Sequence, residues 1–173
     1  MNNFKEGLKN IRAFAFDVDG VLARSEVLLH PGGDLMRTMS TKDGYALQYA
    51  VKRGYPVAII TGGNTDSVGL RFRGLGITDI YLGSNDKKED FNDFIYKYDL
   101  QAGEVLYMGD DLPDYEVLKM AGVPCCPADA VEEIKSLAHY ISPFKGGTGC
   151  VRDVIEQVLR LHGRWMDADS FTW

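Results

Sequence analysis

Short apolar runs alternate along the chain with segments in which apolar residues recur at helical spacing. Runs of strand length and composition occupy residues 11–16, 56–61, 80–82, 105–108 and 123–126. Helices are predicted over about 43–53, 65–74, 87–98, 115–121, 131–137 and 151–161. Strands that alternate with helices are typical of an α/β protein, in which helices cover both faces of a mostly parallel, doubly wound sheet.

One segment interrupts this alternation. Residues 22–38 hold two β-like runs on either side of Pro31-Gly32-Gly33, which predicts a small β-hairpin after the first strand. Because the hairpin follows directly on that strand, we expect it to overhang the sheet edge at which the strand ends. With 173 residues and no linker, residues 1–173 are predicted to form a single domain.

Composition narrows the class of protein. A hydrophobic content of 45% and a charged content of 25% are ordinary for a soluble globular chain, and a net charge of −6 argues against nucleic acid or membrane partners. No apolar run reaches membrane-spanning length, and the first residues lack a signal-peptide pattern. The cysteines Cys125, Cys126 and Cys150 fit neither an even disulfide framework nor a zinc spacing. We therefore expect a cytoplasmic location.

Two carboxylates stand at the end of the first strand. Asp17 and Asp19 follow the apolar run directly, and Gly20 then breaks it. In an open α/β sheet, ligands bind at the carboxyl ends of the strands. Such a pair suits a metal-bound nucleophile and a nearby proton shuttle, although Asp-x-Asp-Gly is also a common turn sequence.

Further polar groups are predicted at the same edge. Thr61 precedes Gly62-Gly63 and a helix start, Lys87 opens another helix, and residues 109–114 read Gly-Asp-Asp-Leu-Pro-Asp. A hydroxyl beside free backbone N–H groups suits a phosphate, and carboxylates from separate strands suit Mg²⁺. A lysine there can balance the charge of a transferring phosphoryl group. Each group is unremarkable alone, as a cap or turn former, but together they indicate phosphate chemistry with a metal.

These segments resemble the four ordered motifs of the haloacid dehalogenase superfamily of phosphotransferases. Within it, residues 42–45, 58–62, 109–114 and 146–153 are similar to the capless family of 3-deoxy-D-manno-octulosonate (KDO) 8-phosphate phosphatases. That family releases KDO for lipopolysaccharide synthesis. The resemblance implies a Rossmann-like core without a cap domain, and a chain of this length leaves no room for one.

The resemblance also implies roles for the motif residues. Asp17 would be the nucleophile that forms an aspartyl-phosphate, and Asp19 would protonate the leaving sugar oxygen and then activate water. The remaining roles are Mg²⁺ binding by Asp17, Asp19 (through its backbone carbonyl) and Asp110; phosphate binding by Thr61, Gly62 and Lys87; and support from Asp111 and Asp114, one of them orienting Lys87.

Family members assemble as homotetramers in which a neighbouring subunit covers the site, with the hairpin and the C-terminal tail taking part. The tail here, residues 163–173, carries Trp165, Phe171 and Trp173, which predicts docking either on its own core or on a neighbour.

Substrate recognition is where the sequence departs from the family. Members often carry a charged residue directly after the Thr-Gly pair, and this chain has Gly63. The missing charge could come from Arg71, Arg73 or Arg152, and Asp43 is a further candidate substrate residue.

Three alternatives remain open. The first is a phosphatase for a nine-carbon sugar acid, such as KDN or N-acylneuraminate 9-phosphate. The second is a receiver-like signalling module, but its acceptor aspartate would follow the third strand, which here ends at Leu82-Gly83 without a carboxylate. The third is a noncatalytic binding module, which the complete set of motif residues argues against.

Overall fold

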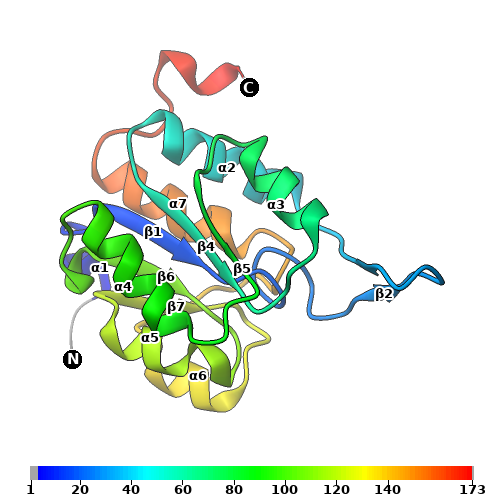
Figure 1. Ribbon diagram of the computed structural model, residues 1–173. Helices are drawn as coiled ribbons and strands as arrows, with labels where there is room; N and C mark the ends of the chain where they lie inside the picture. Colours follow the sequence, from blue (N-terminus) through cyan, green and yellow to red (C-terminus); the bar gives the residue numbers. More distant parts are fainter. Residues whose placement is uncertain (1–3, 173) are drawn as a thin grey trace.

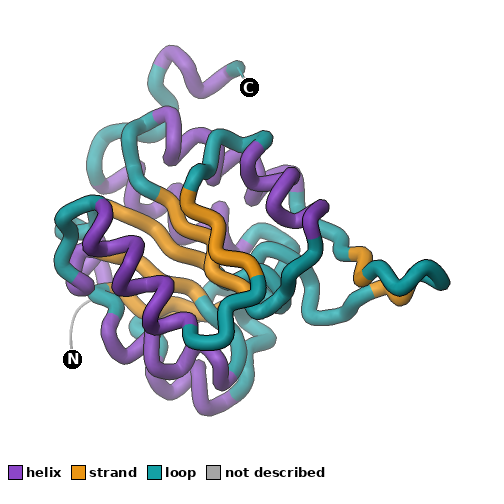
Figure 2. Tube along the Cα trace, viewed as in Figure 1, coloured by secondary structure: helices purple, strands orange, loops and turns teal. Residues whose placement is uncertain are grey.

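The computed structural model describes residues 4–172, in which a six-stranded sheet lies between two layers of helices (Figures 1 and 2). All six strands run parallel, which confirms the predicted doubly wound architecture. Their order across the sheet is β5 (Asp79–Leu82), β4 (Val57–Thr61), β1 (Ala13–Phe16), β6 (Val105–Met108), β7 (Val123–Cys126) and β8 (Tyr140–Ile141).

The central strands are buried on both faces, so their side chains divide between two cores. Phe14 and Phe16 of β1 point into one core, whereas Ala13 and Ala15 point into the other. This division follows from the two-residue repeat of a strand. It explains why β1, β4, β6 and β7 read as continuous apolar runs without a polar face.

Helices close each face of the sheet (Figure 1). One core is packed by residues of α1 (Phe4–Leu8), α2 (Thr41–Lys52), α3 (Asp66–Arg73) and α7 (Cys150–Leu161). The opposite core is packed by residues of α4 (Lys87–Lys97), α5 (Tyr115–Met120) and α6 (Glu132–Leu137). Short 3-10 helices occupy Ala102–Glu104, Leu112–Asp114 and Ala168–Phe171. The helix α1 and the edge strand β8 were not predicted, because five and two residues are too few to show a periodicity.

The predicted hairpin is present and projects from the body of the protein (Figure 1). Its two strands, β2 (Leu28–Leu29) and β3 (Leu35–Met36), pair antiparallel around the Pro-Gly-Gly turn. Leu28 and Leu29 are 66% and 71% exposed, so the strands contribute nothing to either core. The return arm nevertheless brings one side chain, that of Arg37, back to the end of β1.

The C-terminal tail folds back over α2 (Figure 1). Trp165 meets the ring of Tyr49 edge-on at 5.3 Å, and the Tyr49 hydroxyl lies 2.7 Å from Ser170 Oγ. Arg53 pairs with Asp167 at 3.2 Å. Of the tail aromatics, Trp165 thus docks on the chain's own core, Phe171 is 75% exposed, and Trp173 lies outside the described residues.

This topology fixes where a ligand can bind. The chain leaves β1 toward β4 on one side and later returns to β6 on its other side. At such a switch point, the loops that follow the strands diverge and leave a crevice at the carboxyl edge. The loops after β1, β4 and β6 all open there. Within residues 4–172, no helix has the length and apolar character needed to cross a membrane.

Candidate active site

The site is built around the tight loop that follows β1. The Asp17 N–H group still donates to the Met108 carbonyl at 3.1 Å, so Asp17 is anchored between β1 and β6. Gly20 has φ of +89°, and a Cβ at this position would lie 1.9 Å from Asp110 Oδ2. Only glycine lets the β1 and β6 loops approach this closely. The approach brings the carboxylates of the two loops together.

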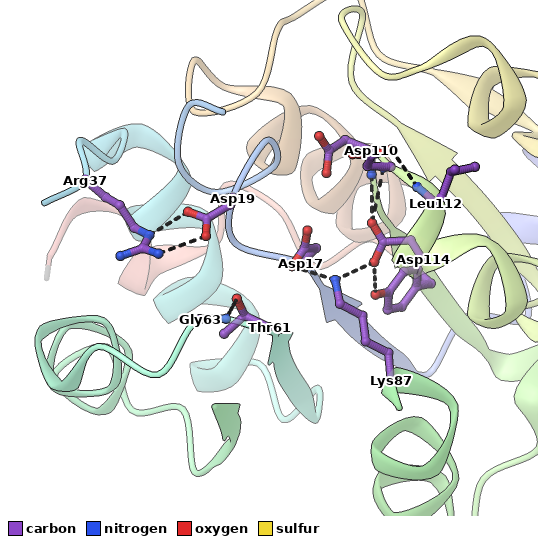
Figure 3. A network of polar contacts seen from close by, with 11 residues as sticks. Asp17, Asp19, Arg37, Thr61, Gly63, Lys87, Asp110, Leu112 and Asp114 are labelled. Carbon is purple, nitrogen blue, oxygen red and sulfur yellow. Dashed lines mark hydrogen bonds and ion pairs between the residues drawn. The ribbon is translucent and has the colours of Figure 1, made fainter. Parts of the chain in front are cut away.

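A buried ionic network joins these loops to the start of α4 (Figure 3). Lys87 Nζ lies 2.8 Å from Asp17 Oδ1 and 2.7 Å from Asp114 Oδ1. The Tyr107 hydroxyl donates to the same Asp114 oxygen at 2.6 Å, and the Asp110 N–H group donates to Asp114 Oδ2 at 3.0 Å. Both oxygens of Asp114 therefore accept hydrogen bonds within the protein. This explains why Asp114 can hold Lys87 in place beside Asp17.

The same cluster fits a divalent cation. Carboxylate oxygens of Asp17, Asp110 and Asp114 lie within 4.8 Å of one another. Asp110 Oδ1 is buried and has no hydrogen-bond partner within residues 4–172, and one lysine leaves this group of three carboxylates with an excess of negative charge. Donors bind both oxygens of Asp114, whereas Lys87 pairs with one oxygen of Asp17, so Asp17 and Asp110 are the carboxylates best placed to bind a metal. Oxygen ligands of this kind suit Mg²⁺.

The pKa values follow from the same crowding. Burial and the neighbouring Asp114 raise the pKa of Asp17 well above its usual value. Burial, Asp114 and Asp111 together raise the pKa of Asp110 to about 7. Burial alone would lower the pKa of Lys87, but Asp17 and Asp114 outweigh it and raise that pKa. Lys87 is thus held as a cation, whereas Asp17 and Asp110 lack enough nearby positive charge to keep their pKa values in the ordinary range.

Asp19 lies on the other side of Asp17 and points away from this cluster (Figure 3). Its two carboxylate oxygens accept from Arg37, at 2.5 Å from Nε and 2.9 Å from Nη2. The predicted contact of Asp19 with a metal runs through its backbone carbonyl, so the side chain remains available for proton transfer. Thr61 is buried nearby, where its Oγ1 accepts from the Gly63 N–H group at 3.1 Å.

All of the predicted motif residues line one pocket of about 520 Å³. They are Asp17, Asp19, Thr61, Gly62, Gly63, Lys87, Asp110, Asp111 and Asp114. A pocket of this size accommodates a small sugar phosphate. The ordered motifs therefore converge in space, as their positions at strand ends predicted.

Four predicted substrate residues, Asp43, Arg71, Arg73 and Arg152, do not line this pocket, and Arg73 is exposed on α3. Both oxygens of Asp43 are used at the start of α7, where they accept from the N–H groups of Gly149 and Arg152 at 3.0 and 2.7 Å. The Arg152 guanidinium lies over the Trp165 ring and pairs with Glu156. Arg71 projects from α3 toward Gly44 on α2. In the described structure the side chains of Asp43, Arg71 and Arg152 serve packing between helices and the tail.

Four residues at or beside the pocket were not anticipated from the sequence: Ser25 and Ser84 line it, whereas Arg37 and Tyr107 contact residues that line it. Arg37 belongs to the hairpin, Tyr107 lies inside an apolar strand, and Ser84 follows β5. The Ser84 hydroxyl is buried and has no hydrogen-bond partner among the described residues. Tyr107 carried the one available signal in the sequence. A tyrosine at the penultimate position of a strand followed by Gly-Asp-Asp can place its hydroxyl beside those carboxylates.

The fold and the site define a haloacid dehalogenase-like hydrolase. The model of that family matches residues 43–122. The chain is 34% identical over 160 residues to 3-deoxy-D-manno-octulosonate 8-phosphate phosphatase KdsC of Escherichia coli K12, covering 92% of this chain and 85% of that protein. The chain belongs to this phosphatase family.

Solved structures agree with this assignment. The phosphatase of the same name from Yersinia pestis superposes with a TM-score of 0.91 at 31% identity, covering 94% of this chain and 88% of that one. The Moraxella catarrhalis phosphatase, crystallised with magnesium, phosphate and KDO, gives a TM-score of 0.88 at 32% identity over 93% of this chain and 92% of that one.

Proposed function

We propose that this protein is a Mg²⁺-dependent phosphatase that hydrolyses KDO 8-phosphate to KDO and phosphate. The observation that carries the proposal is the convergence of Asp17, Asp19, Thr61, Lys87 and Asp110 on one pocket. The name of the family to which the chain belongs gives KDO 8-phosphate as the substrate. We further propose that residues 1–173 form one catalytic domain without a cap.

The reaction divides into two displacements. In the first, an oxygen of Asp17 attacks phosphorus, the bond from phosphorus to the sugar oxygen breaks, and Asp19 donates a proton to the departing oxygen. In the second, Asp19 takes a proton from water as the water attacks phosphorus. The bond from phosphorus to Asp17 then breaks and releases phosphate. Because Asp19 lies two residues beyond Asp17 at the turn, it can serve both steps.

The other residues bind and orient the phosphate. Thr61 and the backbone N–H groups of Gly62 and Gly63 would hold its oxygens, and Lys87 would neutralise part of its charge. Asp114 keeps Lys87 beside Asp17, and Asp111 supports the same loop. Asp17, Asp110 and the backbone carbonyl of Asp19 would hold Mg²⁺, whose positive charge would let a carboxylate approach an anionic phosphate.

The proposal is tested by phosphate release from KDO 8-phosphate, KDN 9-phosphate, N-acetylneuraminate 9-phosphate and hexose phosphates, each with Mg²⁺ or a chelator. We expect KDO 8-phosphate to have the highest kcat/KM and the chelator to abolish turnover. Asp17→Asn should abolish it as well, whereas Glu133→Gln, on the exposed face of α6, should match wild type. A preference for a nine-carbon sugar acid would refute the substrate, and turnover by Asp17→Asn would refute the nucleophile.

We propose that the protein works as a cytoplasmic homotetramer that supplies KDO for lipopolysaccharide synthesis. The exposed Leu28, Leu29 and Met36 of the projecting hairpin support an assembly, because a monomer rarely leaves such a ridge in water. Light scattering of wild type and Leu29→Asp tests the assembly. We expect a tetramer for wild type and smaller species for the variant; a monomeric wild type would refute it.

A further inference from the structure

Arg37, on the return arm of the hairpin, contacts the pocket residue Asp19, and its guanidinium makes several directed contacts (Figure 3). Nε and Nη2 bind the two oxygens of Asp19, while Nη1 donates to the Leu35 carbonyl at 2.8 Å and to Thr65 Oγ1 at 3.1 Å. Only 5% of the Arg37 side chain is exposed. All three nitrogens of the guanidinium are therefore engaged, which fixes its position beside Asp19.

Gly63 makes room for this arginine. A Cβ at position 63 would lie 3.1 Å from Arg37 Nη2 and 3.6 Å from Asp19 Oδ2. A larger side chain there would press directly on the Arg37–Asp19 pair. The absence of a side chain at Gly63 and the presence of a buried arginine beside it are therefore parts of one arrangement, in which the positive charge comes from the hairpin.

Asp19 keeps capacity beyond its contacts with Arg37. Each Asp19 oxygen accepts one hydrogen bond from Arg37 and has a further lone-pair position that can act on the leaving group. A substrate carboxylate that took over this edge of the guanidinium would leave both Asp19 oxygens free for that role. The contacts of Nη1 with Leu35 and Thr65 do not involve Asp19, so they can hold the guanidinium while its other edge changes partner.

We infer that Arg37 binds the carboxylate of the sugar acid and, in exchanging Asp19 for it, frees Asp19 for proton transfer. A guanidinium edge that holds one carboxylate by two parallel N–H groups has the geometry to hold another. The contact makes Arg37 a residue that selects substrates bearing a carboxylate. This inference rests on the proposed function, because it requires a sugar-acid phosphate as substrate.

The test compares Arg37→Gln, Arg37→Lys and wild type on KDO 8-phosphate and on p-nitrophenyl phosphate, which has no carboxylate. For Arg37→Gln we expect KM for KDO 8-phosphate to rise at least tenfold, and kcat/KM to fall at least tenfold more for KDO 8-phosphate than for p-nitrophenyl phosphate. Arg37→Lys keeps the positive charge but loses the paired N–H donors of the guanidinium, so its KM for KDO 8-phosphate should lie between those of wild type and Arg37→Gln. Arg12→Gln, which removes an exposed arginine directly before β1, at the opposite end of that strand from the pocket, should behave as wild type.

A second readout uses binding. KDO itself should inhibit p-nitrophenyl phosphate hydrolysis by wild type, with an inhibition constant at least tenfold weaker for Arg37→Gln. Circular dichroism melts establish that the variants are folded. Equal losses on both substrates would overturn the inference, because they would mean that Arg37 acts only through Asp19, and so would no loss on either.

Failure of the inference is distinguishable from failure of the proposed function. If wild type prefers another sugar-acid phosphate, the KDO assignment fails and the Arg37 comparison is made with that substrate, where the same tenfold effect is expected. A wild type that hydrolyses only esters without a carboxylate would overturn both.

Discussion

Asp43 offers a sharp test of whether a motif residue binds substrate or holds the fold. Asp43 is 1% exposed, and its carboxylate accepts from the N–H groups of Gly149, which precedes α7, and of Arg152 in the first turn of α7. Gly149 occupies the position before α7 and has no side chain that could cap the helix. Asp43 on α2 supplies the missing cap from another element, and so ties α2 to α7.

The expected cost of removing this carboxylate follows from its contacts. Hydrogen bonds to a charged acceptor contribute about 1.5–3 kcal/mol each. Burial raises the pKa of Asp43, which means that desolvation offsets part of this gain. We therefore expect Asp43→Ala to lower the free energy of unfolding by about 3 kcal/mol, and Asp43→Asn, which keeps one acceptor oxygen, by about half of that.

Urea denaturation in the presence of Mg²⁺ measures this effect. With a slope of about 2 kcal/mol/M, the unfolding midpoint of Asp43→Ala should fall by about 1.5 M. Asp34→Ala, at the exposed hairpin turn, is the matched control and should not shift. Folded Asp43→Asn should keep the wild-type KM for KDO 8-phosphate. An unchanged midpoint with a raised KM would refute this reasoning and make Asp43 a substrate ligand.

Three further predictions concern the ionic network and the tail. In the presence of Mg²⁺, Asp114→Asn should lower the free energy of unfolding by about 3 kcal/mol and kcat at least a hundredfold. Donors face both oxygens of Asp114, so the NH₂ group of an amide would have to lie against one of them. Urea denaturation and steady-state kinetics measure the two effects, and wild-type values would contradict the prediction. The rise in melting temperature on adding Mg²⁺ should be larger at pH 8 than at pH 6. The pKa of Asp110 is about 7, so below that pH a proton competes with the metal for its carboxylate. Equal shifts in calorimetry at the two pH values would contradict this prediction. Trp165→Ala should cost about 1–2 kcal/mol in urea and leave kcat/KM unchanged, since the ring packs on Tyr49 rather than at the pocket; a loss of activity without a loss of stability would place the tail over the site.

Most of the fold was predictable because each central strand is a short apolar run, and Gly or Asp follows β1, β4 and β6 directly. The ends of these strands placed Asp17, Thr61 and Asp110 at one edge, since parallel strands all end on the same side. Helix α1 and strand β8 were missed because their five and two residues carry no periodic signal. Their positions depend on packing against α7 and β7 rather than on local sequence.

The site was less predictable wherever a side chain crosses between elements. Asp43 reads as a polar residue in a helix, and nothing near it in the sequence points to Gly149, 106 residues later. Tyr107 reads as an ordinary strand residue until the turn after β6 carries Asp114 back against its hydroxyl. Such partners are set by the paths of separate loops, which a single sequence does not specify.

Arg37 shows the same limit in its strongest form. The sequence drew attention to Gly63 as a lost charge and suggested arginines on the helices, whereas the charge beside Gly63 comes from a hairpin that precedes it by 26 residues. A glycine at a binding position can therefore mark space that a distant side chain fills, rather than a function that is absent. Which side chain fills it depends on the return path of the hairpin, and that path also places Arg37 on the acid–base carboxylate of Asp19. Recognition of the substrate and release of the catalytic proton are coupled here by one guanidinium.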